Sequence, residues 1–163
     1  VMGSHVSATP NHQTGNITPI KFRFDMACAG RLGMELQPRQ MTDEERQFAR
    51  RAIASYKEYR DIVMQGDLYR IGTPYDKSGC YGLMYVSKDR KHSLRYQGRS
   101  LIPKFRLQGL DPKTGYTIRE LNVDKSRNWF DGKTFSGEML SNAGINPSMP
   151  KIYDSGVFLL TAE

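Results

Sequence analysis

Apolar residues recur at every third or fourth position between residues 42 and 64. They are Phe48, Ala52, Tyr56, Tyr59 and Val63. This spacing predicts one buried stripe on an amphipathic helix. Thr42 is followed at the third position by Glu45, the pattern of a capping box that closes the amino end of a helix. The sequence therefore predicts a helix from about Thr42 to about Met64, ended by Gly66.

The residues before this helix alternate between two kinds of element. Short apolar runs at 2–7 and 32–36 predict strands, and Thr18-Pro19 predicts the start of a short helix that Gly30 ends. A strand is the competing interpretation of 20–24, where phenylalanines alternate with basic residues. The order strand, helix, strand, helix is typical of parallel α/β structure. Two strands and two helices cannot cover both faces of a parallel sheet, so residues 1–65 predict the end of a larger parallel sheet or barrel.

The pattern changes after Gly66. Short β-rich runs, separated by turn signals such as Asp131-Gly132, lie at 81–87, 93–97, 105–110, 116–121 and 157–160. Their spacing predicts a small antiparallel β-sandwich over residues 66–163. Residues 136–146 predict a turn or a short helix.

Composition and charge exclude several classes of protein. The 163 residues are too few for a complete eightfold β/α barrel, which needs about 250. The net charge of +7 is spread along the chain, which argues against a nucleic-acid-binding protein, and no apolar run approaches the ~20 residues of a membrane span. Cys28 and Cys80 are too few and too far apart for a disulfide framework, and the three histidines lack metal-ligand spacing, so we expect no metal and no cofactor.

The densest polar stretch is the loop at 7–16. If residues 2–7 form a barrel strand, this loop leaves its carboxyl end, the face where barrel enzymes bind substrate. His5, Asn11, His12 and Gln13 are then candidates for hydrogen bonds with sugar hydroxyls. The alternative is that these side chains cap turns and fix the loop.

A glycosidase needs two carboxylates that face one glycosidic bond. Asp25 lies in the short predicted helix, and Glu35 lies in the second predicted strand, where a side chain facing a core could be a perturbed acid. No two carboxylates are placed by the sequence to converge. We therefore assign no catalytic residue.

Several motifs resemble those of the family-36 glycoside hydrolases, the bacterial α-galactosidases. Met-Gly-Ser-His-Val-Ser-Ala-Thr-Pro-Asn-His-Gln-Thr-Gly at 2–15 is similar to a signature late in the barrel of that family, and Gly-Arg-Leu-Gly-Met-Glu-Leu at 30–36 to its last barrel strand. Tyr-Lys-Glu-Tyr-Arg at 56–60 and Gly-Asp-Leu-Tyr-Arg-Ile at 66–71 resemble the final barrel helix and the entry into the C-terminal β-domain. Leu-Gln-Gly-Leu-Asp-Pro at 107–112 and Gly-Glu-Met-Leu-Ser-Asn-Ala-Gly at 137–144 resemble that domain. The sequence departs from the signature at Thr9 and Asn16.

The resemblance implies a fold and an activity. Residues 1–65 would be the last two β/α units of a TIM barrel, followed by a C-terminal antiparallel β-sandwich domain at 66–163. The family hydrolyses terminal α-galactosides of the raffinose and melibiose type with retention, by means of two aspartates about 5 Å apart. The Lys-Trp-Asp and Ser-Asp-Asp motifs that carry these aspartates are absent, and the only tryptophan is Trp129. We therefore expect a fragment of an α-galactosidase that is inactive alone.

Partners follow from the same interpretation. We expect an oligosaccharide substrate, the rest of the barrel, no nucleic acid, no membrane and a bacterial cytoplasmic location, and homo-oligomers are compatible with the sequence. The open sheet face meant for the rest of the barrel should be apolar and prone to self-association. The alternative is a standalone carbohydrate-binding or structural β-domain protein, with an aromatic platform drawn from Tyr81, Tyr85, Trp129 and Phe130.

Overall fold

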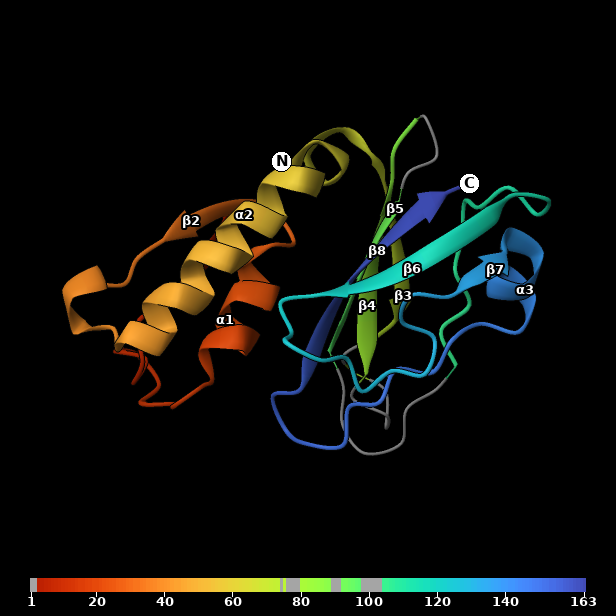
Figure 1. Ribbon diagram of the computed structural model, residues 1–163. Helices are drawn as coiled ribbons and strands as arrows, with labels where there is room; N and C mark the ends of the chain where they lie inside the picture. The colour runs from red at the N-terminus through yellow and green to blue at the C-terminus, as the bar shows by residue number, and fades with distance from the viewer. Residues whose placement is uncertain (1–2, 74, 76–79, 89–91, 98–103) are drawn as a thin grey trace.

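The computed structural model describes residues 3–73, 75, 80–88, 92–97 and 104–163, and its two regions lie side by side (Figure 1). The first region follows the predicted alternation: β1 (Gly3–Val6), α1 (Ile20–Ala27), β2 (Arg31–Met34) and α2 (Asp43–Gln65). A single turn of 3-10 helix, Pro38–Gln40, precedes α2. β1 and β2 are parallel neighbours, with Gly3 beside Arg31 and Val6 beside Met34. Residues 20–27 are helical, so the competing strand interpretation is wrong.

Helix α2 begins as its capping box predicts. The Glu45 amide donates to Thr42 Oγ1 at 3.2 Å, and the Thr42 amide donates to Glu45 Oε2 at 3.1 Å. The buried stripe comprises Ala49, Ala52, Tyr56, Tyr59 and Val63. Among the described helices even this one, at 23 residues, lacks the apolar content that a membrane span requires.

The first region has one apolar core, on one face of the β1–β2 pair. Val6 and Phe24 are completely buried there, and Phe24 meets Phe48 edge to face at 5.7 Å between ring centroids. Side chains alternate along a strand, so the opposite face carries His5, Arg31 and Gly33. The expectation of an apolar open face is therefore wrong, because a histidine and an arginine occupy it. On the alternate positions Val6 and Leu32 pack in the core beneath the helices, whereas Met34 is 40% exposed.

The second region is one six-stranded antiparallel sheet. Its strands are β3 (Asp67–Gly72), β4 (Tyr81–Val86), β5 (His92–Gln97), β6 (Gly115–Leu121), β7 (Thr134–Ser136) and β8 (Ser155–Ala162). They lie in the order β3-β4-β5-β8-β6-β7, with all pairs antiparallel. The last strand therefore lies inside the sheet, between β5 and β6 (Figure 1). α3 (Gly137–Asn142) is the short helix expected at 136–146.

Both faces of this sheet are covered. One face packs on α2 through a core that includes Tyr59, Tyr85 and Val157. The other face carries a larger core around Phe158, closed by α3 and by irregular segments that contribute Phe105, Leu107, Leu140, Ile145 and Met149.

The prediction of a two-sheet sandwich therefore needs correction. All strands of this region in the described part of the chain belong to one sheet, and its second layer is helix and loop. Residues 105–110 look strand-like because Phe105 and Leu107, both 1% exposed, alternate toward the core. Among the described residues the segment makes one bridge, between Phe105 and Ile145, and Gly109 then turns the chain at φ +73°. Alternating burial beneath a sheet can thus occur without a strand.

Candidate functional site

The carboxyl ends of β1 and β2 bring two polar side chains together. His5 Nδ1 lies 2.6 Å from Glu35 Oε1, and the two side chains are 52% and 57% exposed. The Glu35 amide donates to the Val6 carbonyl at 3.0 Å, which continues the parallel register past the end of β2. The imidazole lies against Gly33, where an added Cβ would stand 2.6 Å from His5 Cδ2. A carboxylate-bound imidazole therefore occupies the open face of the pair.

Asn11 organises the loop that leaves β1. Its Oδ1 accepts from the amides of Gln13 and Thr14, each at 3.0 Å, and from Thr14 Oγ1 at 3.2 Å. Its backbone also bonds to Asn16 and Gly15. The amide oxygen is therefore used within the turn, as the alternative interpretation of this loop held.

Arg23 fastens the same loop to the two helices. The guanidinium donates from Nη1 to the Ser7 carbonyl at 2.8 Å, and Nη2 lies 3.4 Å from Glu45 Oε1. Arg23 is only 7% exposed, and burial lowers the pKa of its guanidinium while the Glu45 carboxylate acts against that change. A buried arginine with these partners holds the start of the loop over α1.

A cleft of about 260 Å³ opens between this loop and α1. Its polar lining includes His5, Ser7, Asn11, Asn16 and Arg23, and its apolar side is made by Phe22, Met26 and Tyr153. Polar groups beside apolar ring faces are the surroundings that sugars use, with hydrogen bonds at the hydroxyls and C–H contacts on rings. His5 and Asn11 are thus brought to one cleft, whereas His12 and Gln13 are exposed in the turn outside it.

Glu35 joins this site, although the sequence alone did not place it with His5. The two residues are 30 positions apart. The contact could be predicted from the parallel register of the two strands. In that register His5 is the neighbour of Gly33, and Glu35 lies two residues further along on the same face. That register follows only once both strands and their parallel order are known.

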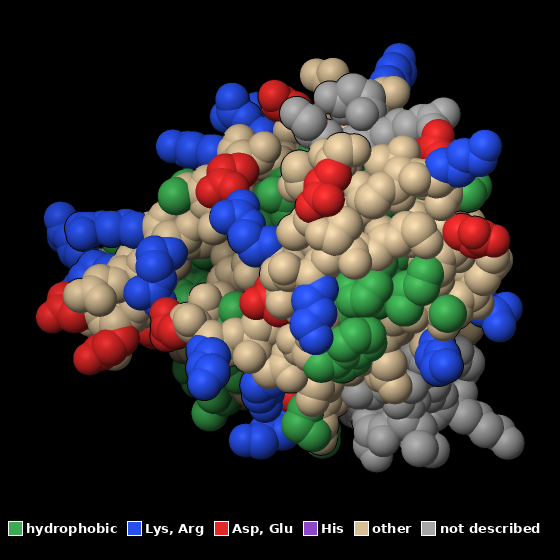
Figure 2. Space-filling model, turned by 45° about the vertical axis from the view of Figure 1, so that its right-hand side comes forward, with side chains coloured by type: hydrophobic (Ala, Val, Ile, Leu, Met, Phe, Trp, Pro, Cys, Tyr) green, Lys and Arg blue, Asp and Glu red, His purple; other side chains and the backbone are tan. Residues whose placement is uncertain are grey.

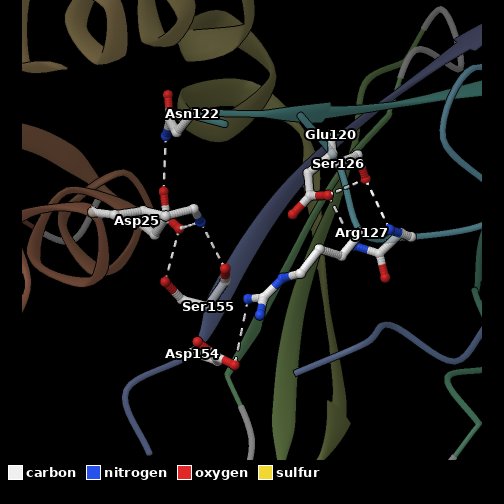
Figure 3. A network of polar contacts seen from close by, with 9 residues as sticks. Asp25, Glu120, Asn122, Ser126, Arg127, Asp154 and Ser155 are labelled. Carbon is white, nitrogen blue, oxygen red and sulfur yellow. Dashed lines mark hydrogen bonds and ion pairs between the residues drawn. The ribbon is translucent and has the colours of Figure 1, made fainter. Parts of the chain in front are cut away.

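Asp25, the other candidate carboxylate, lies in the boundary between the two regions (Figure 3). It is completely buried, and it accepts hydrogen bonds from Ser155 Oγ at 2.7 Å, from Asn122 Nδ2 at 2.8 Å and from the Lys21 ammonium. Lys21 also donates to the Ser155 carbonyl at 2.6 Å. These contacts connect α1 to β8 and to the turn after β6, so Asp25 is a structural carboxylate.

A second polar cluster lies near Asp25, in the second region. Glu120 Oε2 accepts from Asn128 Nδ2 at 2.8 Å and from the Ser126 hydroxyl, and Arg127 lies 3.5 Å from Asp154 (Figure 3). Asn128 Oδ1 in turn accepts from the Ser148 amide at 2.6 Å. These contacts tie the loop at 126–128 to β6 and to the segment at 148–154, so the cluster is structural.

Charges elsewhere are dispersed. Figure 2 shows Lys and Arg side chains scattered over the visible face, with Asp and Glu side chains between them. Across residues 3–73, 75, 80–88, 92–97 and 104–163 no group of three His, Cys, Asp or Glu side chains could hold a metal ion. Cys28 and Cys80 are buried thiols in different cores.

Comparison with known families matches almost the whole chain. Residues 1–66 match the Melibiase model, and residues 80–160 match the glycosyl hydrolase family 36 C-terminal domain. Among curated proteins, the chain is 33% identical to the bifunctional alpha-galactosidase/sucrose kinase AgaSK of Mediterraneibacter gnavus over 98% of its own length. It is 34% identical to alpha-galactosidase AgaA of Geobacillus stearothermophilus over 88% of its length. The matches cover 17% and 19% of these relatives, so the chain spans about a fifth of their length.

Solved structures agree with these matches. The galactosidase domain of AgaSK superimposes with a TM-score of 0.86 at 32% identity, over 99% of this chain and 22% of that one. AgaB from Geobacillus stearothermophilus gives 0.85 at 31% identity, with the same coverage. A variant of AgaA solved with raffinose gives 0.84 at 30% identity. Both regions thus keep their mutual arrangement in these structures, and the chain belongs to glycoside hydrolase family 36, whose C-terminal region it matches.

Proposed function

We propose that this chain is the C-terminal part of a retaining α-galactosidase that hydrolyses terminal α-galactosides such as raffinose and melibiose. One observation carries the proposal: the whole chain, across both regions and their boundary, superimposes on a fifth of such enzymes with a TM-score of 0.86. Relatives solved with raffinose and with stachyose support the class of substrate. In this proposal β1–α1–β2–α2 form the last two units of the barrel, and β1 and β2 are completed by strands from the preceding sequence.

In this proposal both catalytic aspartates of the enzyme lie outside residues 1–163. The two candidate carboxylates of the first region already have partners. Asp25 is buried among three hydrogen-bond donors, and Glu35 contacts His5. His5 and the cleft beside it would line the substrate face of the barrel, with Asn11 shaping the loop and His12 and Gln13 at its exposed tip. The β-domain would support the last helices of the barrel through the Asp25 contacts. A cytoplasmic location and a homo-oligomer belong to the same proposal.

An activity assay tests this proposal. The 163-residue chain and the full-length protein that contains it are each given p-nitrophenyl α-galactoside and raffinose. We expect the full-length protein to release nitrophenol and galactose and the chain alone to release neither. Hydrolysis by the chain alone would overturn the assignment of the catalytic pair, and an inactive full-length protein would overturn the function.

Sugar binding without catalysis is the second candidate, favoured by one observation. Trp129 is 57% exposed, and its ring is held by Phe130, by Phe135 and by Lys133, whose Nζ lies 5.3 Å from the ring centroid. The aromatic platform for sugar binding is smaller than the sequence predicted, because Tyr85 and Phe130 are buried. Since Trp129 is the only tryptophan, a change in its fluorescence on titration with galactose would support this candidate, and an unchanged spectrum would exclude stacking on this ring.

A further inference from the structure

The contact between His5 and Glu35 determines which nitrogen of the imidazole is available. Glu35 Oε1 lies 2.6 Å from Nδ1, a separation typical of a charge-assisted hydrogen bond. An ionised carboxylate can only accept, so Nδ1 carries the proton. In the neutral ring Nε2 is then an acceptor, and no described residue donates a hydrogen bond to it.

Gly33 makes room for this arrangement. Gly33 is the cross-strand neighbour of His5, and the ring covers it so closely that a methyl group there would lie 2.6 Å from Cδ2 and 3.1 Å from Nε2. A side chain at position 33 would displace the imidazole from both its place and its partner. The glycine at this position therefore has a specific steric role, whereas an added Cβ at Gly3, on the same face, meets nothing within 4 Å.

We propose that Glu35 is a positioning residue, and that it presents His5 Nε2 as an acceptor for a hydroxyl hydrogen of the α-galactoside. The inference rests on the proposed function. The pair lies at the carboxyl ends of two parallel strands, the side on which barrel enzymes bind substrate, and His5 lines the 260 Å³ cleft. The His5 and Glu35 side chains are both about half exposed on the open face of the strand pair. A ligand can therefore reach His5 Nε2 without displacing an existing contact. Metal-free sugar recognition uses this kind of oriented acceptor.

The activity test uses the full-length protein with four variants: His5→Ala, Glu35→Ala, the double variant and Glu35→Gln. We expect each alanine variant to raise KM for p-nitrophenyl α-galactoside roughly tenfold, the size of one lost hydrogen bond to a substrate, with kcat within about twofold of wild type. The double variant should be no worse than His5→Ala alone, because Glu35 acts through His5. Glu35→Gln should retain most of the affinity, since its amide oxygen still accepts from Nδ1.

Gly33→Ala provides a steric test, with Gly3→Ala as its matched control. The first variant should raise KM as His5→Ala does, and the second should leave it unchanged. Both are placed in strands of the same pair, so a general weakening of the pair would affect both alike.

The tautomer is tested independently in the 163-residue chain. Long-range ¹H–¹⁵N NMR of His5, recorded at a pH at which the ring is neutral, should show Nδ1 protonated and Nε2 bare, and Glu35→Ala should shift the ring toward the Nε2-protonated form. A bare Nδ1 in the wild type would overturn the proposal.

Three further outcomes separate this inference from the function it rests on. A full-length wild type without galactosidase activity overturns the function and this inference with it. An active wild type whose His5→Ala variant keeps its KM overturns the inference alone. Additive losses in the double variant overturn the positioning role of Glu35, because they show that its effect does not pass through His5.

Discussion

The two sheets of this molecule differ in how many of their faces are covered. The β1–β2 pair buries one face under α1 and α2, and its other face carries His5 and Arg31. The six-stranded sheet is covered on both faces, by α2 on one side and by α3 with irregular segments on the other. In β4, Met84 and Val86 accordingly belong to one core, and Tyr85 belongs to the other. In β1, only Val6 is fully buried.

The number of covered faces is reflected in the sequences of the strands. A strand with apolar residues at nearly every position needs layers on both sides, whereas a strand with one apolar face tolerates an open polar face. Helix α2 connects the two cases, because Ala49 and Ala52 belong to the core of the first region, and Tyr56, Tyr59 and Val63 to the core beneath the second sheet. We therefore expect the two regions to unfold as one unit.

The largest expected effect tests this shared unfolding. Phe158 is completely buried near the centre of β8 and meets Phe130 at 5.5 Å between ring centroids. Phe158→Ala should lower the free energy of unfolding by about 3–5 kcal/mol through lost burial and the cavity left behind. Urea unfolding followed by circular dichroism measures it. Phe24→Ala, in the other region, should act on the same single transition, and two separate transitions would show that the regions fold independently.

The boundary between the regions gives the next effect. Asp25→Asn removes the charge that Lys21 faces, and the amide cannot accept from all three donors, so we expect a loss of about 3 kcal/mol. Thermal unfolding compares it with Asp61→Asn, whose side chain is 82% exposed beside Arg60 and should change little. If both variants lost the same stability, the buried Asp25 carboxylate would not be what holds the two regions together.

Loss of one hydrogen bond from a tyrosine hydroxyl across the same boundary should lower stability less. Tyr85 Oη donates to the Ala29 carbonyl, so Tyr85→Phe should lower stability by about 1 kcal/mol and speed hydrogen exchange at the end of α1. Tyr116→Phe is the control, because its hydroxyl accepts from the Asp111 amide within the β-domain. Faster exchange at α1 in both variants would mean that the effect is global.

The smallest effect comes from an exposed ion pair between α2 and β6. Arg119 Nη2 lies 2.7 Å from Glu58 Oε2, with both side chains at least half exposed. Glu58→Gln should lower the free energy of unfolding by about 0.5 kcal/mol or less, an effect that added salt should abolish. A loss above about 1 kcal/mol that persists at high salt would show that this surface contact contributes as much as a buried one.

The sequence predicted most of the first region but less of the second. The capping box at Thr42 and the stripe along α2 are local signals, each read within a few residues, and the structure confirms both. The predicted sandwich was wrong because the alternation of Phe105 and Leu107 reports burial and not pairing. β7 was missed because three residues, Thr134–Ser136, carry too little pattern.

The candidate site shows the same division. His5 and Asn11 were chosen from residue type and from their places in the first predicted strand and in the loop after it, and the structure places both at the cleft. The partner of His5 and the buried role of Asp25 depend on residues 30, 97 and 130 positions away. No local spacing specifies such contacts.

The sequence by itself determined the ends of helix α2, the parallel alternation at 1–65 and membership in the family, because capping, amphipathic periodicity and family motifs are properties of short stretches. The tertiary structure alone decided that β8 enters the middle of the sheet, that Glu35 meets His5 over Gly33, and that Asp25 connects two regions. These features depend on which distant segments bury each other, and that choice is made by the energy of the whole packed chain.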